Sequence, residues 1–353
     1  MTQYASNASL EAIADRLRQA RGDIVVVTHA KPDGDALGSA LALTLALHRI
    51  HKPARAFLVA PVAEFLQGLD ADGVATVIEP SEEQALPHDA ALYVVVDTGA
   101  YGQLGPQQRV IEENLHRTIV IDHHLSGDVQ GHLRYIDGNA AACCEILALL
   151  VEKLLDASGW AKPIADLIFA GIASDTGWFR FSNTHPETHR LAARLLEMGV
   201  DHAALYGRLE QSERPEKLRL LVRALESLEL LCHDRVAVMS LHKNDFEETG
   251  AFEHETERLV DTPQIVGSVR VVALVAEATN HAEGGQPLTR VSFRAKPGDE
   301  AVNVAELAQR FGGGGHARAA GAKIEADVDE VLQQLRQAMP EALEAATGER
   351  ARD

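Results

Sequence analysis

The sequence predicts a two-domain α/β protein, in which a mainly parallel sheet domain is joined by a helical connector to a smaller α/β domain. Its 353 residues are more than one hydrophobic core usually fills. In the first half of the chain, short apolar segments alternate with helical patterns, which is typical of parallel strands linked by helices. We place the first domain at residues 1–187, the connector at 188–215 and the second domain at 216–345.

In the first domain, four apolar segments are expected to be strands, at residues 23–27, 54–60, 91–97 and 117–122. An amphipathic helix is expected at the N-terminus, with Ser9 as its N-cap. A second helix is expected to open at Gly38 and Ser39, and a third near Cys143.

The second half begins with leucines that recur at helical spacing between Thr188 and Leu231, with Pro215 as a helix start. Strands are then expected at residues 235–241, 268–279 and 287–296. Helices are expected at 301–311 and 328–339.

The composition excludes several classes of protein. Asp plus Glu number 52 against 33 for Lys plus Arg, a formal charge of −19, so the surface should repel a long nucleic acid duplex. The three cysteines form no CxxC pair, which argues against a thiolate metal site or a disulfide framework. Neither a signal-peptide core nor a membrane-spanning apolar run is found. We therefore expect a cytoplasmic protein that is not associated with a membrane.

Acidic and histidine side chains follow several of the expected strands. The first strand is followed by His29, Asp33 and Asp35, and later ones by Asp97 and by the run Asp122 to His124. We interpret Asp175 as lying at a fourth junction between a strand and the helix that follows it. Taken singly, each acidic residue could be a helix cap or a turn former, and His29 could simply be solvated. The coincidence of four junctions favours a site, because ligands gather at the carboxyl ends of parallel strands.

Four carboxylates brought together at one sheet edge need positive charge. Asp33, Asp35, Asp97 and Asp175 would raise one another's pKa values unless cations neutralised them, and two divalent ions balance four charges. Oxygen ligands with some imidazole favour Mn²⁺ or Mg²⁺ over zinc, and manganese is the first choice. A pair of such ions can activate a bridging water, so hydrolysis of a phosphoester is the expected reaction.

Four motifs in this order and spacing resemble the DHH phosphoesterase superfamily: THAKPDGDALGS, VVVDT, DHH and GIASDTGWFRFSNT. The segment FGGGGHARAAG, residues 311–321, is similar to the GGGH motif of the DHH-associated C-terminal domain, so the resemblance covers nearly the whole chain. It implies two divalent ions, Mn²⁺ first, with Mg²⁺ or Co²⁺ as alternatives. The implied ligands of one ion are His29, Asp33 and Asp97, and those of the other are Asp35, Asp97, His123 and Asp175. Asp97 would bridge the two ions.

The same resemblance implies the catalytic and substrate-binding residues. His124 would face the scissile phosphate, as an acid or a hydrogen-bond donor, and Asp122 would orient the histidines. In the second domain, the substrate would be bound by the residues Arg294, Gly313, Gly314, Gly315 and His316. Backbone N–H groups of such glycines can approach an anion closely, and an arginine can bind a phosphate through two donors.

Within the superfamily, the chain looks like the NrnA-type proteins, which hydrolyse short RNAs and 3′-phosphoadenosine 5′-phosphate (pAp) and are often dimeric. We therefore expect a homodimeric hydrolase acting on short RNA or a mononucleotide bisphosphate. A phosphodiesterase for cyclic di-AMP or for linear dinucleotides (pGpG, pApA) is the alternative. A non-catalytic nucleotide sensor is the alternative outside enzymes, against which the complete ligand set argues.

Overall fold

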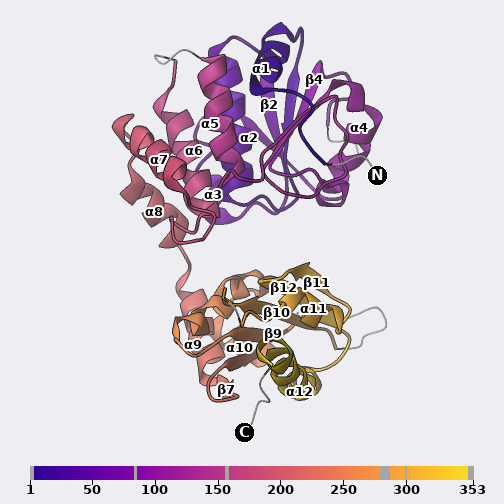
Figure 1. Cartoon of the computed structure of the whole chain (residues 1–353), viewed down its shortest axis with the longest axis vertical. Coiled ribbons are helices and arrows are strands. Elements are labelled where there is room, and N and C mark those ends of the chain that lie inside the picture. The colour runs from indigo at the N-terminus through magenta and orange to yellow at the C-terminus, as the bar shows by residue number, and fades with distance from the viewer. Residues whose placement is uncertain (1–3, 83–85, 156–158, 279–286, 299, 349–353) are drawn as a thin grey trace. The chain divides into compact units, whose positions relative to one another are not determined.

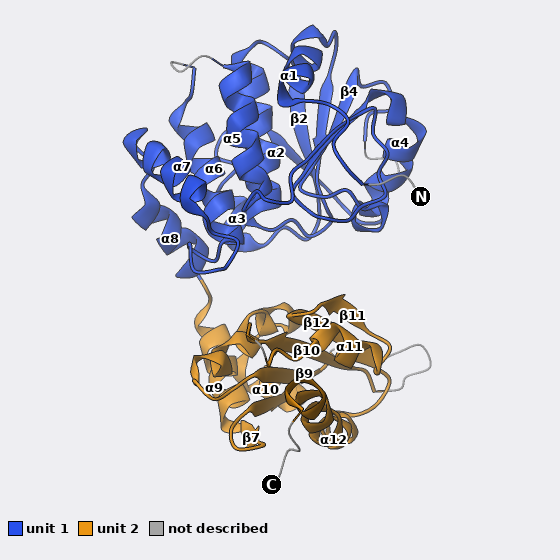
Figure 2. Cartoon of the chain, in the orientation of Figure 1, with its two compact units in different colours: residues 1–212 blue, residues 213–353 orange. Residues whose placement is uncertain are grey.

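The protein is represented by a computed structural model that describes residues 4–82, 86–155, 159–278, 287–298 and 300–348. The chain divides into two compact units, residues 1–212 and 213–353 (Figure 2). The division falls inside the connector expected at 188–215, and the predicted domain limits stay a proposal. Among the described helices, none is both long and apolar enough to cross a bilayer.

Unit 1 contains a sheet whose six strands are all parallel, in the order β3-β2-β1-β4-β5-β6. In chain order the strands are β1 (Ile24–Val27), β2 (Ala54–Val59), β3 (Ala75–Ile78), β4 (Leu92–Val96), β5 (Thr118–Asp122) and β6 (Leu133–Ile136). The four predicted strands are confirmed. The strand order reverses between β1 and β4, and such a reversal opens a ligand-binding crevice at the carboxyl ends of the two strands.

Helices cover both faces of this sheet (Figure 1). They are α1 (Leu10–Gln19), α2 (Gly34–Arg49), α3 (Glu64–Gln67), α4 (Gln108–Glu113), α5 (Cys143–Leu154), α6 (Lys162–Asp175), α7 (Pro186–Glu197) and α8 (His202–Glu210), with short 3₁₀ turns at Tyr101–Gln103, Gly105–Gln107 and Leu115–Arg117. Along β1, Val26 packs into the core under α1, α2, α5 and α6, while Val25 packs into the core on the side of α4. Ser9 caps α1, as predicted, by accepting a hydrogen bond from the Ala12 N–H.

In unit 1, two expectations about local structure are wrong. Helix α2 begins at Gly34 rather than Gly38, because Asp33 is its N-cap and accepts hydrogen bonds from the N–H groups of Asp35 and Ala36, both at 3.0 Å. Asp35 therefore lies in the first turn. Asp175 does not follow a strand but is the last residue of helix α6.

Unit 2 contains a second six-stranded sheet, in the order β11-β12-β10-β9-β8-β7, in which only β8 and β9 pair in parallel. The strands are β7 (Glu229–Leu231), β8 (Val236–Leu241), β9 (Val271–Glu277), β10 (Thr289–Ala295), β11 (Gly314–His316) and β12 (Ala319–Ile324). The helices are α9 (Pro215–Glu226), α10 (Lys243–Thr249), α11 (Val304–Gln309) and α12 (Val328–Thr347), with 3₁₀ turns at Glu253–Thr256 and Leu259–Ile265. The predicted start at Pro215 is confirmed, whereas β7 lies where a helical pattern was expected.

The two faces of the second sheet are covered differently. Phe293 and the neighbouring side chains of its face pack with α11 and α12. On the opposite face, Val272 and Leu274 of β9 pack with α9 and α10, but Ser292 and Arg294 of β10 are only half-buried. This face is therefore open over β10, β12 and β11.

Candidate metal centre

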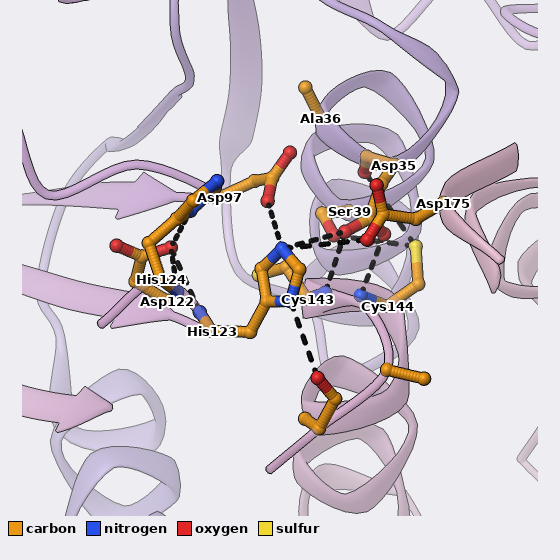
Figure 3. Close-up of polar contacts among 12 residues, drawn as sticks. Asp35, Ala36, Ser39, Asp97, Asp122, His123, His124, Cys143, Cys144 and Asp175 are labelled. Atoms are coloured by element: carbon orange, nitrogen blue, oxygen red, sulfur yellow. Dashed lines mark hydrogen bonds and ion pairs between the residues drawn. The ribbon is translucent and has the colours of Figure 1, made fainter. Parts of the chain in front are cut away.

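The six predicted ligands lie together at the carboxyl edge of the first sheet. Figure 3 shows four of them, Asp35, Asp97, His123 and Asp175. His29 follows β1, Asp97 follows β4 and His123 follows β5 directly. Helix α2 supplies Asp35 and its N-cap Asp33, and the end of α6 supplies Asp175. The strand reversal between β1 and β4 thus brings side chains from separate loops to one place.

The first group that could hold a metal ion is His29, Asp33 and Asp97, with ligand atoms all within 4.8 Å of one another. His29 Nε2 lies 3.9 Å from Asp33 Oδ1 and 3.7 Å from Asp97 Oδ2. The other ring nitrogen, Nδ1, is 3.0 Å from the Ala30 carbonyl. A donor at Nδ1 leaves the Nε2 lone pair facing the carboxylates, which is how metal-binding imidazoles are oriented.

The second group is Asp35, His123 and Asp175, again within 4.8 Å. His123 Nε2 lies 4.0 Å from Asp35 Oδ2 and 3.7 Å from Asp175 Oδ2. Its Nδ1 is 3.3 Å from the Ala140 carbonyl, so this ring is oriented like that of His29.

Asp97 belongs to both sets of neighbours. Its Oδ1 is 3.4 Å from His123 Nε2, while its Oδ2 faces His29. The side chain is 3% exposed, yet Oδ1 accepts no well-formed hydrogen bond from the described residues. The backbone of Asp97 is left-handed, with φ of 58°, a conformation that few residues other than glycine, asparagine and aspartate adopt. A buried carboxylate oxygen without a donor, between two imidazoles, fits a site for cations.

Asp35 is held by the start of helix α5. Its Oδ2 accepts from the Cys143 N–H at 2.6 Å and its Oδ1 from the Cys144 N–H at 2.9 Å. These are the first amides of α5, whose partial positive charge stabilises an anion. Gly171 of α6 gives the carboxylate room, because a Cβ there would lie 2.8 Å from Asp35 Oδ1. The sequence analysis missed these two roles, since neither an apolar helix start nor a mid-helix glycine signals such a contact.

Mutual repulsion and burial shift the pKa values of this cluster. Burial and the neighbouring Asp97 and Asp175 carboxylates raise the pKa of Asp35 well above its usual range, and burial raises that of Asp175 to about 6. Burial alone would lower the pKa of the two imidazoles, but the facing Asp97 carboxylate and the other nearby carboxylates raise it to about 9 in His29 and to about 10 in His123. Without metal, both imidazoles are thus in the protonated, positively charged form at neutral pH. A bound cation would displace the extra protons and supply the positive charge in their place.

Asp122 and His124 form a pair beside the metal groups. The Asp122 side chain is fully buried, and its Oδ1 lies 2.7 Å from His124 Nδ1 and accepts from the N–H groups of His123 and His124. This hydrogen bond raises the pKa of His124. A ring nitrogen of His124 also lies within 4.8 Å of ligand atoms of Asp97 and His123. The Asp122 Oδ2 accepts from the hydroxyl of Tyr4 at 2.6 Å, a residue that sequence reasoning did not single out.

In unit 2, the structure places Arg294 and His316 in one row across three strands. Arg294 of β10 pairs with Ala319 of β12, which pairs with His316 of β11, so the three side chains share the open face of the sheet. The Arg294 Nε is 3.0 Å from Asp261 Oδ1, a partner that the sequence did not reveal.

The three glycines before His316, residues 313–315, differ in the space around them. A Cβ at Gly315 would lie 2.6 Å from the Ala319 carbonyl, and one at Gly313 would overlap the backbone of β12. Gly314 faces open space and has no unusual backbone conformation. Packing therefore explains Gly313 and Gly315, but it does not explain Gly314.

Comparison with known proteins assigns the family. The model of the DHH family, N-terminal domain, matches residues 23–172, and that of the DHHA1 domain matches residues 234–345. Over 343 residues, the chain is 34% identical to the bifunctional oligoribonuclease and PAP phosphatase NrnA of Thermus thermophilus, with 96% of this chain and 95% of that protein covered. The chain belongs to the DHH family. The resemblance seen in the motifs and the predicted fold class are thereby confirmed.

Two further relatives agree with this assignment to the DHH family. The protein of the same name from Bacillus subtilis is 28% identical over 322 residues, covering 88% of this chain and 93% of that protein. Among solved structures, an exopolyphosphatase-related protein from Bacteroides fragilis has the same fold, with a TM-score of 0.87 at 23% identity and coverage of 98% and 99%.

Proposed function

We propose that the protein is a metal-dependent phosphoesterase that hydrolyses short oligoribonucleotides and the 3′-phosphate of pAp. One observation carries the proposal: the two oxygens of the buried Asp97 face His29 and His123, each of which belongs to its own group of metal-binding side chains. The relatives from Thermus thermophilus and Bacillus subtilis, both bifunctional oligoribonucleases and PAP phosphatases, support the substrate class.

The proposed cofactor is a pair of divalent ions, with Mn²⁺ preferred over Mg²⁺ and Co²⁺. His29, Asp33 and Asp97 would hold one ion, and Asp35, Asp97, His123 and Asp175 the other. Four carboxylates with two imidazoles and no thiolate suit Mn²⁺ in particular. Such a pair lowers the pKa of water and balances the charge of the phosphate.

Beside these ligands, His124 is the proposed catalytic residue. Its Nδ1 is hydrogen-bonded to Asp122, which leaves Nε2 to protonate the leaving oxygen or to donate a hydrogen bond to the phosphate. Asp122 fixes the orientation of the ring and supports its charge.

In unit 2, we assign substrate binding to the row of Arg294 and His316 together with Gly313, Gly314 and Gly315. Arginine can bind a phosphate through two parallel hydrogen bonds, and glycine N–H groups suit a closely approaching anion. The charge of −19 supports a small substrate, since a long polyanion would be repelled outside the site. We further propose that the protein acts as a cytoplasmic homodimer, and that residues 188–215 connect a catalytic domain (1–187) to a substrate-binding domain (216–345).

A panel of substrates tests this function. Turnover with Mn²⁺ is measured on pAp, on RNA of two to five nucleotides, on an RNA 24-mer, on pGpG and on cyclic di-AMP. We expect kcat/KM to be highest for pAp and the shortest RNAs and lowest for the 24-mer. If cyclic di-AMP or pGpG is turned over faster than pAp and faster than the other short RNAs of the panel, the dinucleotide phosphodiesterase alternative replaces the proposal. Tight binding without turnover of any substrate would make the protein a sensor.

A further inference from the structure

The segment from Tyr4 to Ala8, which precedes α1, is bound along the edge strand β6. The N–H groups of Asn7 and Ala8 donate to the Arg134 carbonyl at 3.0 and 3.2 Å, and the Arg134 N–H donates to Asn7 Oδ1 at 2.6 Å. Ser6 Oγ exchanges hydrogen bonds with the backbone of Ile136. The segment is therefore anchored through Ser6, Asn7 and Ala8, independently of Tyr4.

Tyr4 itself reaches away from β6 to the DHH motif. Its ring lies in a slot between two glycines: a Cβ at Gly99 would overlap the phenol, and one at Gly127 would lie 2.6 Å from ring carbons. The N–H groups of Asp128 and Val129 close the slot by donating to the Gly99 carbonyl at 2.7 and 2.8 Å. Burial and the Asp122 carboxylate raise the pKa of the phenol, so the hydroxyl keeps its proton and donates it to Asp122.

The two carboxylate oxygens of Asp122 contact different side chains, one Tyr4 and the other His124. Oδ2 receives the Tyr4 hydroxyl at 2.6 Å, and Oδ1 lies 2.7 Å from His124 Nδ1. Because the Asp122 side chain is fully buried, a carboxylate without Tyr4 would have an unpaired Oδ2 and would be held through Oδ1 alone, which allows it to rotate. Rotation of this carboxylate would move the acceptor that fixes the imidazole.

We propose that Tyr4 is a positioning residue for catalysis: its hydroxyl holds the Asp122 carboxylate in the orientation in which Oδ1 binds His124. The inference rests on the proposed function, which gives His124 its chemical role. It adds a residue of the segment before α1 to the active site, through a contact that spans 118 positions of the sequence.

The test compares Tyr4→Phe with Asn7→Ala. Tyr4→Phe keeps the ring in its slot and removes one hydroxyl, whereas Asn7→Ala weakens the anchoring on β6 and leaves Asp122 untouched. Partners that orient a functional group are worth about 10- to 100-fold in activity, so we expect kcat of Tyr4→Phe on pAp to fall by about that factor. KM and bound Mn²⁺ should stay unchanged. Asn7→Ala should lower Tm while its kcat stays near that of the wild type.

Two further measurements separate positioning from other roles. In an Asp122→Asn background, Tyr4→Phe should have no further effect on kcat, because the group through which it acts has changed. In the metal-free protein, the NMR resonance of the His124 Nδ1 proton, assigned by its loss in His124→Ala, should shift or broaden in Tyr4→Phe and not in Asn7→Ala.

Three results overturn the inference: a kcat of Tyr4→Phe equal to the wild type, an equal fall in kcat for Asn7→Ala, or an unchanged His124 resonance in Tyr4→Phe. A wild-type protein without turnover on any nucleotide would instead reject the proposed function. The resonance would still report whether Tyr4 positions the Asp122–His124 pair.

Discussion

The candidate metal centre of unit 1 and the candidate substrate row of unit 2 are built in opposite ways. Asp35 and Asp97 are 1% and 3% exposed. The first N–H groups of α5 fix the Asp35 carboxylate, and two imidazoles face that of Asp97. His316 lies on β11, whose three residues are all exposed, and Arg294 is half-buried with Asp261 as an acidic partner. The contacts of the first region are thus formed without a substrate, whereas the side chains of the second would be ordered by the substrate that we propose they bind. Changes in unit 1 should therefore lower kcat or metal affinity, and changes in unit 2 should raise KM.

The largest effect is expected for Asp97→Asn. One carboxylate faces both groups of ligands, so its loss should leave two cations without their shared anion. We expect kcat to fall by more than ~10³-fold, beyond what a single transition-state donor contributes. Steady-state kinetics and metal analysis check this. A variant that still binds two ions and turns over at a substantial rate would refute the bridging assignment.

His124→Ala should lower kcat by roughly 10²–10⁴-fold, the usual contribution of a general acid. Both metal ions should remain bound, because the proposed ligands are all still present. Metal content of the purified variant decides the point. Loss of one equivalent would show that His124 is itself a ligand.

Mn²⁺ affinity should rise with pH. The pKa values of about 9 for His29 and about 10 for His123 mean that both rings are protonated near neutral pH and must lose a proton to bind metal. Affinity should therefore increase by up to ~100-fold per pH unit between pH 7 and 8.5, the limit for two displaced protons. Below pH 6, protonation of Asp175 should weaken binding further.

Titration calorimetry in buffers of different ionisation enthalpy counts the protons released. His316→Ala is the control, since its ring is in unit 2, and its proton count should equal that of the wild type. Affinity independent of pH would contradict the protonated state of the two imidazoles.

Arg294→Ala and His316→Ala should each raise KM for pAp while metal binding stays intact. A charge-assisted contact to phosphate corresponds to a loss of about 10- to 100-fold in kcat/KM. Arg290→Ala is the matched control, because Arg290 lies on the same face of β10 and also pairs with a carboxylate, that of Glu253, but lies outside the row of Arg294 and His316. Equal effects of all three substitutions would indicate a general charge effect rather than a site.

The smallest effect is expected at Gly314. Gly314→Ala meets no neighbouring atom, so it should leave Tm unchanged and raise KM a few-fold if a ligand approaches this backbone. Gly313→Ala should instead lower stability by about 1–3 kcal/mol, because its Cβ overlaps β12. Thermal melts and kinetics on the pair separate the two roles. An unchanged KM for Gly314→Ala would remove that residue from the substrate site.

The sequence predicted those parts of the site that depend on local pattern. Buried strands such as β4 and β5 are continuous apolar runs, and the residues that end them, Asp97 and Asp122, could be located without tertiary information. Parallel strands then place these ends at one edge. The same reasoning failed for Asp175, since a helix end that points at a sheet edge has no periodic signature.

Other features depend on contacts between distant residues. β3 and β6 are half-buried and only four residues long, and β11 and β12 consist mostly of glycine and alanine. The first two are too short for a clear strand pattern, and the last two lack its apolar side chains. The bond from Tyr4 to Asp122 and the room that Gly171 leaves for Asp35 arise only when the elements pack.

The left-handed backbone of Asp97 also restricts how this protein can change in evolution. Asparagine and glycine adopt that conformation readily, whereas glutamate, with its longer side chain, does so at a cost. A lineage that abandons hydrolysis while keeping the fold is thus expected to carry Asn or Gly at this position. Either residue would keep the backbone conformation and remove the carboxylate that the two ions are proposed to share.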